Sequence, residues 1–71
     1  MKPIEINIKV FEAMKKHLPV EHKGIEYERI LDYILWYDDN GKLRQSVVLL
    51  QNRSSVRVLV DEVTVVEPKR L

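Results

Sequence analysis

The amino-acid sequence predicts a small, mainly β domain with one N-terminal helix. Three apolar segments rich in β-forming residues lie between residues 25 and 67, and two short polar turns, residues 38–41 and 52–55, join them. This pattern is typical of an antiparallel meander. An amphipathic segment precedes the meander. We therefore expect a helix followed by a small antiparallel barrel or by a five-stranded curled sheet.

Length and composition limit the class of protein. The chain of 71 residues is expected to form a single domain, residues 1–71, with one small core. It contains no cysteine, which excludes disulfides and thiolate metal sites and is typical of a reducing, cytoplasmic location. No apolar run has the length of a membrane-spanning helix. The 12 Lys and Arg nearly balance the 11 Asp and Glu, so composition gives nucleic-acid binding no support.

The first predicted element is a helix within residues 1–19. Its larger apolar residues fall on one stripe, formed by Ile4, Ile8, Phe11, Met14 and Leu18. Basic residues near its end suit the helix dipole, and Pro19 ends it. Residues 4–10 also alternate as a strand does, so the start of the helix stays open.

The second predicted element is an antiparallel sheet over residues 20–67, followed by a tail, residues 68–71. Lys23-Gly24 indicates a tight hairpin in which Gly24 supplies the positive φ. Residues 25–37 are spaced like a helix face, yet their aromatic and β-branched content and the Asp-Asp-Asn-Gly that follows favour a strand. If residues 27–37 were helical, the chain would be a two-helix α+β domain.

The two turns of the meander predict one consistent register. A three-residue loop at residues 39–41 places Leu31 opposite Leu49, and a four-residue loop at residues 52–55 places Leu49 opposite Val58. One face then collects apolar side chains that we expect to form the core: Leu31, Tyr33, Leu35, Leu43, Val47, Leu49, Val56, Val58 and Val60. A slip of one residue would move all of them to the other face.

The opposite face of this sheet mixes apolar and charged residues. It carries Ile30, Ile34, Trp36, Val48, Leu50 and Leu59 together with Asp32, Arg44, Ser46 and Arg57. A sheet with one solvated face is normally polar there. We therefore expect a cover, which is the N-terminal helix, a second copy of the chain or a partner. The helix is the simplest of the three.

The order of the short strands resembles that of SH3-like barrels. The resemblance rests on Gly24-Ile25-Glu26-Tyr27, the hairpin ending in Asn40-Gly41, Ser46-Val47-Val48-Leu49-Leu50 and Val60-Asp61-Glu62-Val63. The chain looks most like small SH3-like β-barrel proteins of Gram-positive bacteria. The resemblance implies a fold and a binding role toward peptides, proteins or nucleic acids, and it implies no functional residue.

The residues required for catalysis do not come together in this sequence. His17 and His22 have no further His or Cys with which to complete a metal site. The serines lack a nucleophile elbow, and the two glycines form no phosphate loop. We expect no enzymatic activity, no cofactor and no metal.

Two binding functions remain, and membrane binding is not among them. The first is protein interaction or self-association through Trp36, Ile34, Arg44, Arg57 and Leu59, because Trp and Arg are typical interface anchors. The second is nucleic-acid binding by an SH3-like barrel, with Trp36 stacking on a base beside Arg29, Lys42, Arg44, Arg53 and Arg57. Acidic residues nearby oppose the second function: Glu26, Glu28, Asp32, Asp38 and Asp39.

Overall fold

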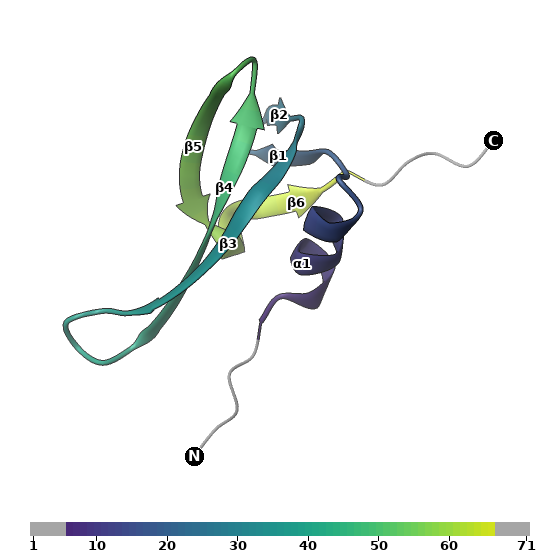
Figure 1. The fold of residues 1–71 in the computed structure, drawn as a ribbon. Coiled ribbons are helices and arrows are strands. Elements are labelled where there is room, and N and C mark those ends of the chain that lie inside the picture. The colour runs from purple at the N-terminus through teal and green to yellow at the C-terminus, as the bar shows by residue number, and fades with distance from the viewer. Residues whose placement is uncertain (1–5, 67–71) are drawn as a thin grey trace.

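The computed structural model describes residues 6–66, which form one helix and six strands (Figure 1). Their order is α1 (Ile8–Lys15), β1 (Val20–His22), β2 (Ile25–Tyr27), β3 (Arg29–Tyr37), β4 (Leu43–Gln51), β5 (Ser54–Leu59), the 3-10 turn η1 (Val60–Glu62) and β6 (Val63–Val65). The strands form two antiparallel sheets, β2-β1-β6 and β3-β4-β5. The mainly β fold with one helix is confirmed, and the helical alternative for residues 27–37 is excluded. Within the described residues the sheets form no closed barrel, so the curled sheet is the alternative that holds.

The apolar segment 25–37 is two strands rather than one, and this accounts for the sixth strand. β2 pairs with β1, whereas β3 pairs with β4. Glu28 lies between them and its backbone N–H donates to the carbonyl of Leu50 at 2.8 Å. The chain passes from one sheet to the other at Glu28. The sequence hides this crossing because both halves have the composition of a strand.

Two of the predicted turns are confirmed. Lys23 and Gly24 close the β1–β2 hairpin with φ angles of 52° and 81°. The loop between β3 and β4 has Gly41 at a φ of 75°, and Tyr37 faces Leu43 as expected. At both glycines the left-handed conformation is needed to reverse the chain, and glycine adopts it at little steric cost.

The predicted four-residue loop at residues 52–55 is wrong. The turn consists of Asn52 and Arg53 alone, at φ angles of 47° and 69°, and Gln51 pairs with Ser54. Two consecutive positive φ angles define the tight hairpin turn whose twist matches that of the strands. Asparagine tolerates this region, but arginine at the second position gives no sequence signal for it.

The shorter turn moves β5 by two residues against β4 and leaves the predicted core face intact. Val56 faces Leu49, where Val58 was predicted, and Val58 faces Val47, where Val60 was predicted. Because side chains alternate with a period of two, a shift of two keeps each one on its face. Val47, Leu49 and Val60 are buried, and Val58 packs against them half-buried.

A β-bulge in β3 changes one member of the core. The register with β4 shifts between Ile30 and Asp32, so that Ile30 faces Leu49 in place of Leu31. Ile30 is 2% exposed and Leu31 is 42% exposed. The placement of Leu31 in the core and of Ile30 on the opposite face was therefore wrong, because one extra residue reverses the alternation of side chains.

The end of the β3–β4 hairpin extends beyond the rest of the molecule (Figure 1). β5 ends at Leu59, which pairs with Ser46 of β4. Beyond this pair β3 and β4 pair only with each other. Leu35 and Tyr37 are exposed there, although Leu35 was expected in the core. Val56, at the other end of the same face, is also exposed. The core thus occupies only the middle of the predicted apolar face.

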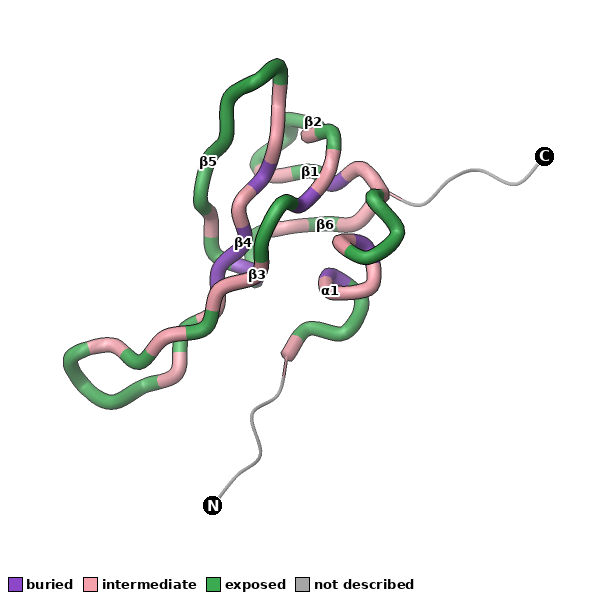
Figure 2. The backbone as a smooth tube through the Cα atoms, in the orientation of Figure 1, coloured by how far each residue is buried: buried purple, intermediate pink, exposed green. Residues whose placement is uncertain are grey.

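Helix α1 and the sheet β2-β1-β6 cover the face that carries Val47. The buried core consists of Val10, Ala13, Val20, Ile30, Val47, Leu49 and Val60. The ring of Phe11 meets that of Tyr33 edge-on, 5.9 Å between centroids, and Tyr33 lies opposite Val47. Figure 2 shows the buried residues where these elements meet. The expectation that the helix covers the face with Trp36 was therefore wrong.

The helix begins later than its apolar stripe suggested. The side chain of Asn7 caps it by accepting the N–H of Val10 at 3.1 Å. Its buried residues are Val10 and Ala13, whereas Ile8 is 68% exposed, so the predicted stripe is rotated. Ile4 and the predicted tail, residues 68–71, lie outside the described residues.

The helix ends before Pro19, as predicted, through backbone bonding. Leu18 N–H donates to the carbonyl of Ala13 at 3.0 Å, and His17 N–H donates to that of Met14 at 3.3 Å. This is a Schellman motif, with His17 at a φ of 56° where glycine is more usual. The reversal brings the chain from the helix directly into β1.

Candidate interaction surface

The uncovered face of the sheet β3-β4-β5 carries all five residues predicted for an interaction surface. In β3 and β4 they alternate with core-facing residues such as Tyr33 and Val47, so they point away from the core. This surface is named the Trp36 face and consists of Ile34, Trp36, Arg44, Arg57 and Leu59. As predicted, Arg44 lies directly opposite Trp36.

The apolar members of the Trp36 face remain accessible to solvent. Leu59 is 42% exposed, and Ile34 and Trp36 are half-buried. Both possible covers within the described chain, α1 and the second sheet, pack on the other side. An accessible apolar group of this kind on a sheet face is a mark of interaction sites.

The side chain of Arg57 crosses β4 and orders the centre of the Trp36 face. Its Nε donates to the Oγ of Ser46 at 2.8 Å, and its guanidinium carbon lies 4.6 Å from the centroid of the Trp36 ring. Such a cation–π contact contributes about 0.5–1 kcal/mol at an exposed site. Ser46 is only 2% exposed and its hydroxyl is satisfied by Arg57. The small serine leaves room for the arginine, whose guanidinium lies over the indole of Trp36.

Asp38 holds Arg44 at the other end of the Trp36 face. The Nε of Arg44 lies 3.1 Å from the Oδ2 of Asp38. The backbone N–H groups of Asn40 and Lys42 donate to Oδ1 at 2.9 Å each. The pKa of Asp38 is lowered chiefly by the hydrogen bond from Lys42, with those from Asn40 and Arg44 adding to it against partial desolvation. The carboxylate therefore ties the β3–β4 loop to Arg44.

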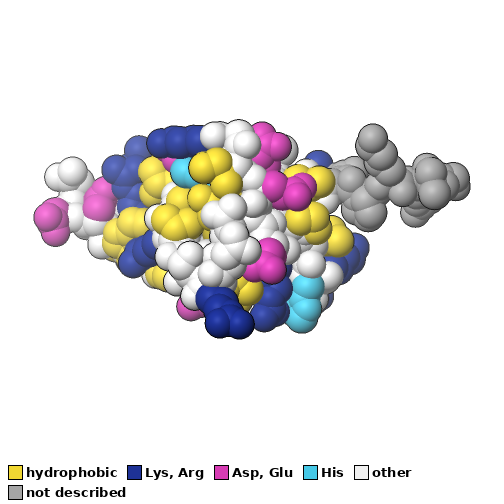
Figure 3. Space-filling model, turned by 90° about the horizontal axis from the view of Figure 1, so that it is seen from above, with side chains coloured by type: hydrophobic (Ala, Val, Ile, Leu, Met, Phe, Trp, Pro, Cys, Tyr) yellow, Lys and Arg dark blue, Asp and Glu magenta, His cyan; other side chains and the backbone are white. Residues whose placement is uncertain are grey.

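The Trp36 face has more positive than negative charge. The register adds Arg29, opposite Leu50, and Asp32, opposite Val48. Three arginines thus share the face with one aspartate, while Asp38 neutralises Arg44 from the loop. Elsewhere the signs are mixed, and on the side seen in Figure 3 basic and acidic side chains are interspersed among hydrophobic ones.

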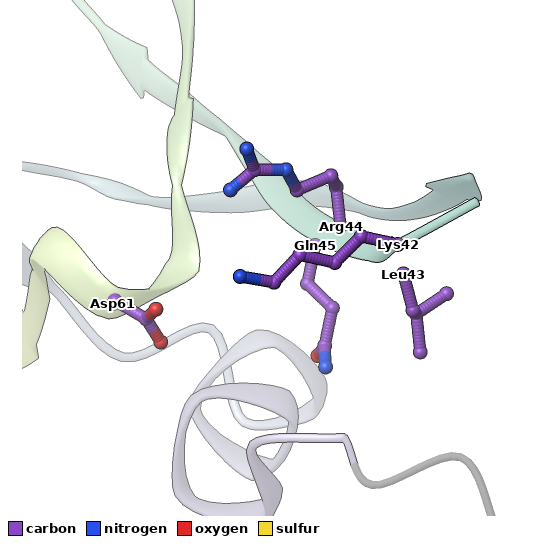
Figure 4. A pocket seen from close by; sticks show the side chains of 5 residues that line it. All are labelled: Lys42, Leu43, Arg44, Gln45 and Asp61. Atoms are coloured by element: carbon purple, nitrogen blue, oxygen red, sulfur yellow. The ribbon is translucent and has the colours of Figure 1, made fainter. Parts of the chain in front are cut away.

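A small polar hollow lies beside β4 beyond the end of β5. Its volume is about 160 Å³, and it is lined by Lys42, Leu43, Arg44, Gln45 and Asp61. Figure 4 shows the amine of Lys42 extended toward Asp61 of η1. Small-molecule sites typically enclose roughly 300–1,000 Å³. None of the lining residues is a Ser, Cys or His, so the hollow does not contain the Ser–His or Cys–His pair of nucleophilic catalysis.

The histidine of β1 forms a hydrogen bond with a carboxylate. The Nε2 of His22 lies 2.9 Å from the Oε2 of Glu62 and joins β1 to η1. This hydrogen bond, followed by the charge of Lys23, lowers the pKa of Glu62. Within residues 6–66 no group of three or more His, Cys, Asp or Glu is placed to hold a metal ion.

We expect acid to destabilise the protein through Glu62 and Asp38. Both have a pKa below the ordinary values of 4.5 and 3.8. A carboxyl group whose pKa is lower in the folded than in the unfolded state stabilises the fold above its unfolded pKa, and this stability is lost as pH falls through the folded pKa. Melting temperatures measured below pH 4.5 should fall, and Glu62→Gln should make the fall shallower.

Glu26→Gln is the control for this measurement, since Glu26 is an exposed carboxyl of β2 without an ion pair among residues 6–66. Its melting temperature should follow that of the unchanged protein at every pH. An equally steep fall in the Glu62→Gln variant would contradict the role of the His22 pair.

Sequence reasoning found the five residues of the Trp36 face but not the contacts among them. It placed Ser46 on this face without a role, and it missed that Arg57 reaches Trp36. A small polar residue at the start of the apolar run Val47-Val48-Leu49-Leu50 was the available signal. It marks the point where a long side chain from the neighbouring strand lies over the sheet.

Comparison with known proteins identifies no relative of this chain. No family model matches the chain, and neither a curated protein nor a solved structure is significantly similar to it. Across residues 6–66 no helix combines the length and apolar character required to span a bilayer.

Proposed function

We propose that this chain is a non-enzymatic binding module whose Trp36 face contacts a protein. The observation that carries the proposal is the accessible apolar centre of this face, Ile34, Trp36 and Leu59, on a sheet whose other side is already packed. Arg57 lies over the indole and favours this orientation before any partner binds. Such ordering lowers the entropy that binding must overcome. Trp and Arg at the centre of a surface are the residue types that carry most binding energy at interfaces.

The charges of the face indicate the chemistry of the partner. Arg29, Arg44 and Arg57 surround the apolar centre and Asp32 is the one acidic residue among the strands of this face. A complementary surface places apolar side chains at its centre and carboxylates at its rim. The resemblance to SH3-like barrels supports the same class of function, because those domains also act by binding.

Trp36→Ala is expected to abolish capture of the partner from extracts of the native host. Truncating an anchor of this type commonly lowers affinity by 2 kcal/mol or more, which is roughly thirtyfold. Tyr37→Ala is the matched control, because Tyr37 is the next residue of β3, is 65% exposed and points to the opposite side. Circular dichroism should show both variants folded.

The comparison of the two variants decides the proposal. Proteins retained by the unchanged chain and by Tyr37→Ala but lost with Trp36→Ala support binding at the Trp36 face. If the partner there is a second copy, Trp36→Ala alone should convert dimers to monomers. Identical capture by both variants would show that this face does not bind.

Nucleic-acid binding is the second candidate, and the packing of Trp36 beside Arg57 on an open sheet face favours it. Base stacking on an aromatic side chain contributes about 1–3 kcal/mol per base. The formal net charge of +1 and the neutralisation of Arg44 by Asp38 weigh against it. Fluorescence anisotropy with mixed-sequence single-stranded DNA tests it. Binding that weakens steeply with salt and is lost in Trp36→Ala supports this function, and absence of binding at low salt excludes it.

A further inference from the structure

Strand β5 is an open edge of its sheet. It pairs with β4 alone, and five of its six residues are exposed. The two-residue turn makes Gln51 and Ser54 a hydrogen-bonded pair, and hydrogen-bonded and non-hydrogen-bonded pairs then alternate along the strands. The backbone N–H and C=O groups that point away from β4 are therefore those of Ser55, Arg57 and Leu59.

This edge carries none of the features that keep strand edges apart. β5 contains no Lys, Pro or Gly, and its register with β4 has no bulge. Val56 and Leu59 on it are 39% and 42% exposed. Its one charged side chain, Arg57, is drawn back over β4 toward Ser46 and Trp36. The edge is thus free to accept another strand.

We propose that β5 pairs antiparallel with β5 of a second copy of this chain, about a two-fold axis at Arg57. An antiparallel edge is self-complementary, which is the condition for a closed dimer. This register uses all three outward-pointing residues, since Ser55 faces Leu59 of the second copy at both ends and Arg57 faces its own equivalent. On the core side it sets Val56 beside Val58 of the second copy, which extends the apolar surface across the junction.

The arginines at the axis do not oppose this register. Each Arg57 guanidinium is held over its own Trp36 ring, at 4.6 Å from the centroid, and not at the strand edge. The resulting six-stranded sheet places the two Trp36 faces on one side. The dimer contact uses the edge of β5 and not this face. The dimer and the proposed binding at the Trp36 face can therefore be tested independently.

Charges at the two ends of β5 select the antiparallel arrangement. Arg53 lies in the turn before β5 and Asp61 lies in η1 after it, so the two-fold axis puts the end of β5 that carries Arg53 in each copy next to the end that carries Asp61 in the other. Both residues are exposed, and no ion pair or hydrogen bond joins either side chain to another of residues 6–66, although the amine of Lys42 extends toward Asp61 (Figure 4). A parallel arrangement would place Arg53 beside its own equivalent. The opposite charges at the two ends therefore favour the antiparallel arrangement over the parallel one.

A charge exchange at this pair tests the dimer. Analytical ultracentrifugation of the unchanged chain should show a monomer–dimer equilibrium. Arg53→Asp or Asp61→Arg should each raise the dimer dissociation constant about tenfold, because each replaces two attractions by two repulsions. The double variant should return to near the original value. Since Arg53 and Asp61 lie at opposite ends of β5 in one chain, the recovery reports contact between copies.

Amide hydrogen exchange provides a readout that does not depend on variants. The N–H groups of Ser55, Arg57 and Leu59 should be protected only at concentrations where the dimer forms. Those of Val56 and Val58, bonded to β4, should be protected at every concentration. Glu26→Arg, which changes net charge as Asp61→Arg does, and Ile34→Ala, which changes the Trp36 face but leaves the contact of Arg57 with Trp36 in place, should both retain the dimer.

Four results would each overturn the proposal. They are a monomer at about 1 mM, a dimer in which the three outward amides exchange freely, a double variant that dimerises no more strongly than the single ones, and a folded Ile34→Ala chain that has lost the dimer. The last would place self-association on the Trp36 face.

Discussion

Leu49→Ala is expected to lower the free energy of unfolding by about 2–5 kcal/mol, enough to unfold much of the protein. Leu49 is 0% exposed and lies on the central strand β4, between Ile30 of β3 and Val56 of β5. Because strands pair with β4 on both sides, the backbone cannot move to fill the space that the missing atoms leave. A domain of 71 residues has a total stability of only several kcal/mol, at roughly 0.05–0.15 kcal/mol per residue.

The measurement is urea unfolding followed by far-ultraviolet circular dichroism. Leu50→Ala is the matched control, since Leu50 is the next residue of β4, is half-buried and lies on the face that α1 does not cover. It should lose clearly less stability than Leu49→Ala. An unchanged unfolding midpoint for Leu49→Ala would remove this residue from the core.

The second large effect is expected at the β-bulge of β3. Ile30→Ala should cost about 2–5 kcal/mol, whereas Leu31→Ala should cost less than about 1 kcal/mol. The two residues are neighbours of similar size, but Ile30 is 2% exposed and packs in the core, while Leu31 is 42% exposed. The difference between them therefore reports the bulge itself, because regular alternation would place Leu31 opposite Leu49.

Thermal unfolding of the two alanine variants, measured side by side, checks this expectation. A folded Leu31→Ala with a melting temperature near that of the unchanged protein, next to a strongly destabilised Ile30→Ala, is the expected outcome. The reverse order would mean that β3 runs without a bulge and that the register predicted from the turns holds along its whole length.

Much of the local structure follows from nearby residues alone. Lys23-Gly24 and Asn40-Gly41 form the turns that their glycines predict, because the positive φ angles needed there are open to glycine. The apolar alternation of β4 identifies Val47 and Leu49 as core residues, and both are fully buried. The five residues of the Trp36 face also share one side, as the register predicted.

Errors in the register had unequal consequences. The turn at Asn52-Arg53 was two residues shorter than expected, yet every side chain of β5 kept its face, because the period of a strand is two. The bulge at Leu31 added a single residue and exchanged the faces of Ile30 and Leu31. A polar turn is visible in sequence, but a bulge inside an apolar run is not, since both neighbours are equally suited to the core.

Local sequence features predict the strands of the meander and most of its apolar face, whereas the tertiary fold sets which face is covered. Alternation and turn chemistry are local properties, so they indicate the three strands of the meander and place Trp36 on the side opposite the core. The side on which α1 packs depends on the path of the chain through the Schellman turn at His17 and through β1. On that side Val10 and Ala13 of α1 form one core cluster with Val47 and Leu49. The helix and the second sheet together remove these apolar side chains from water, which stabilises the fold. The Trp36 face is left open as a result.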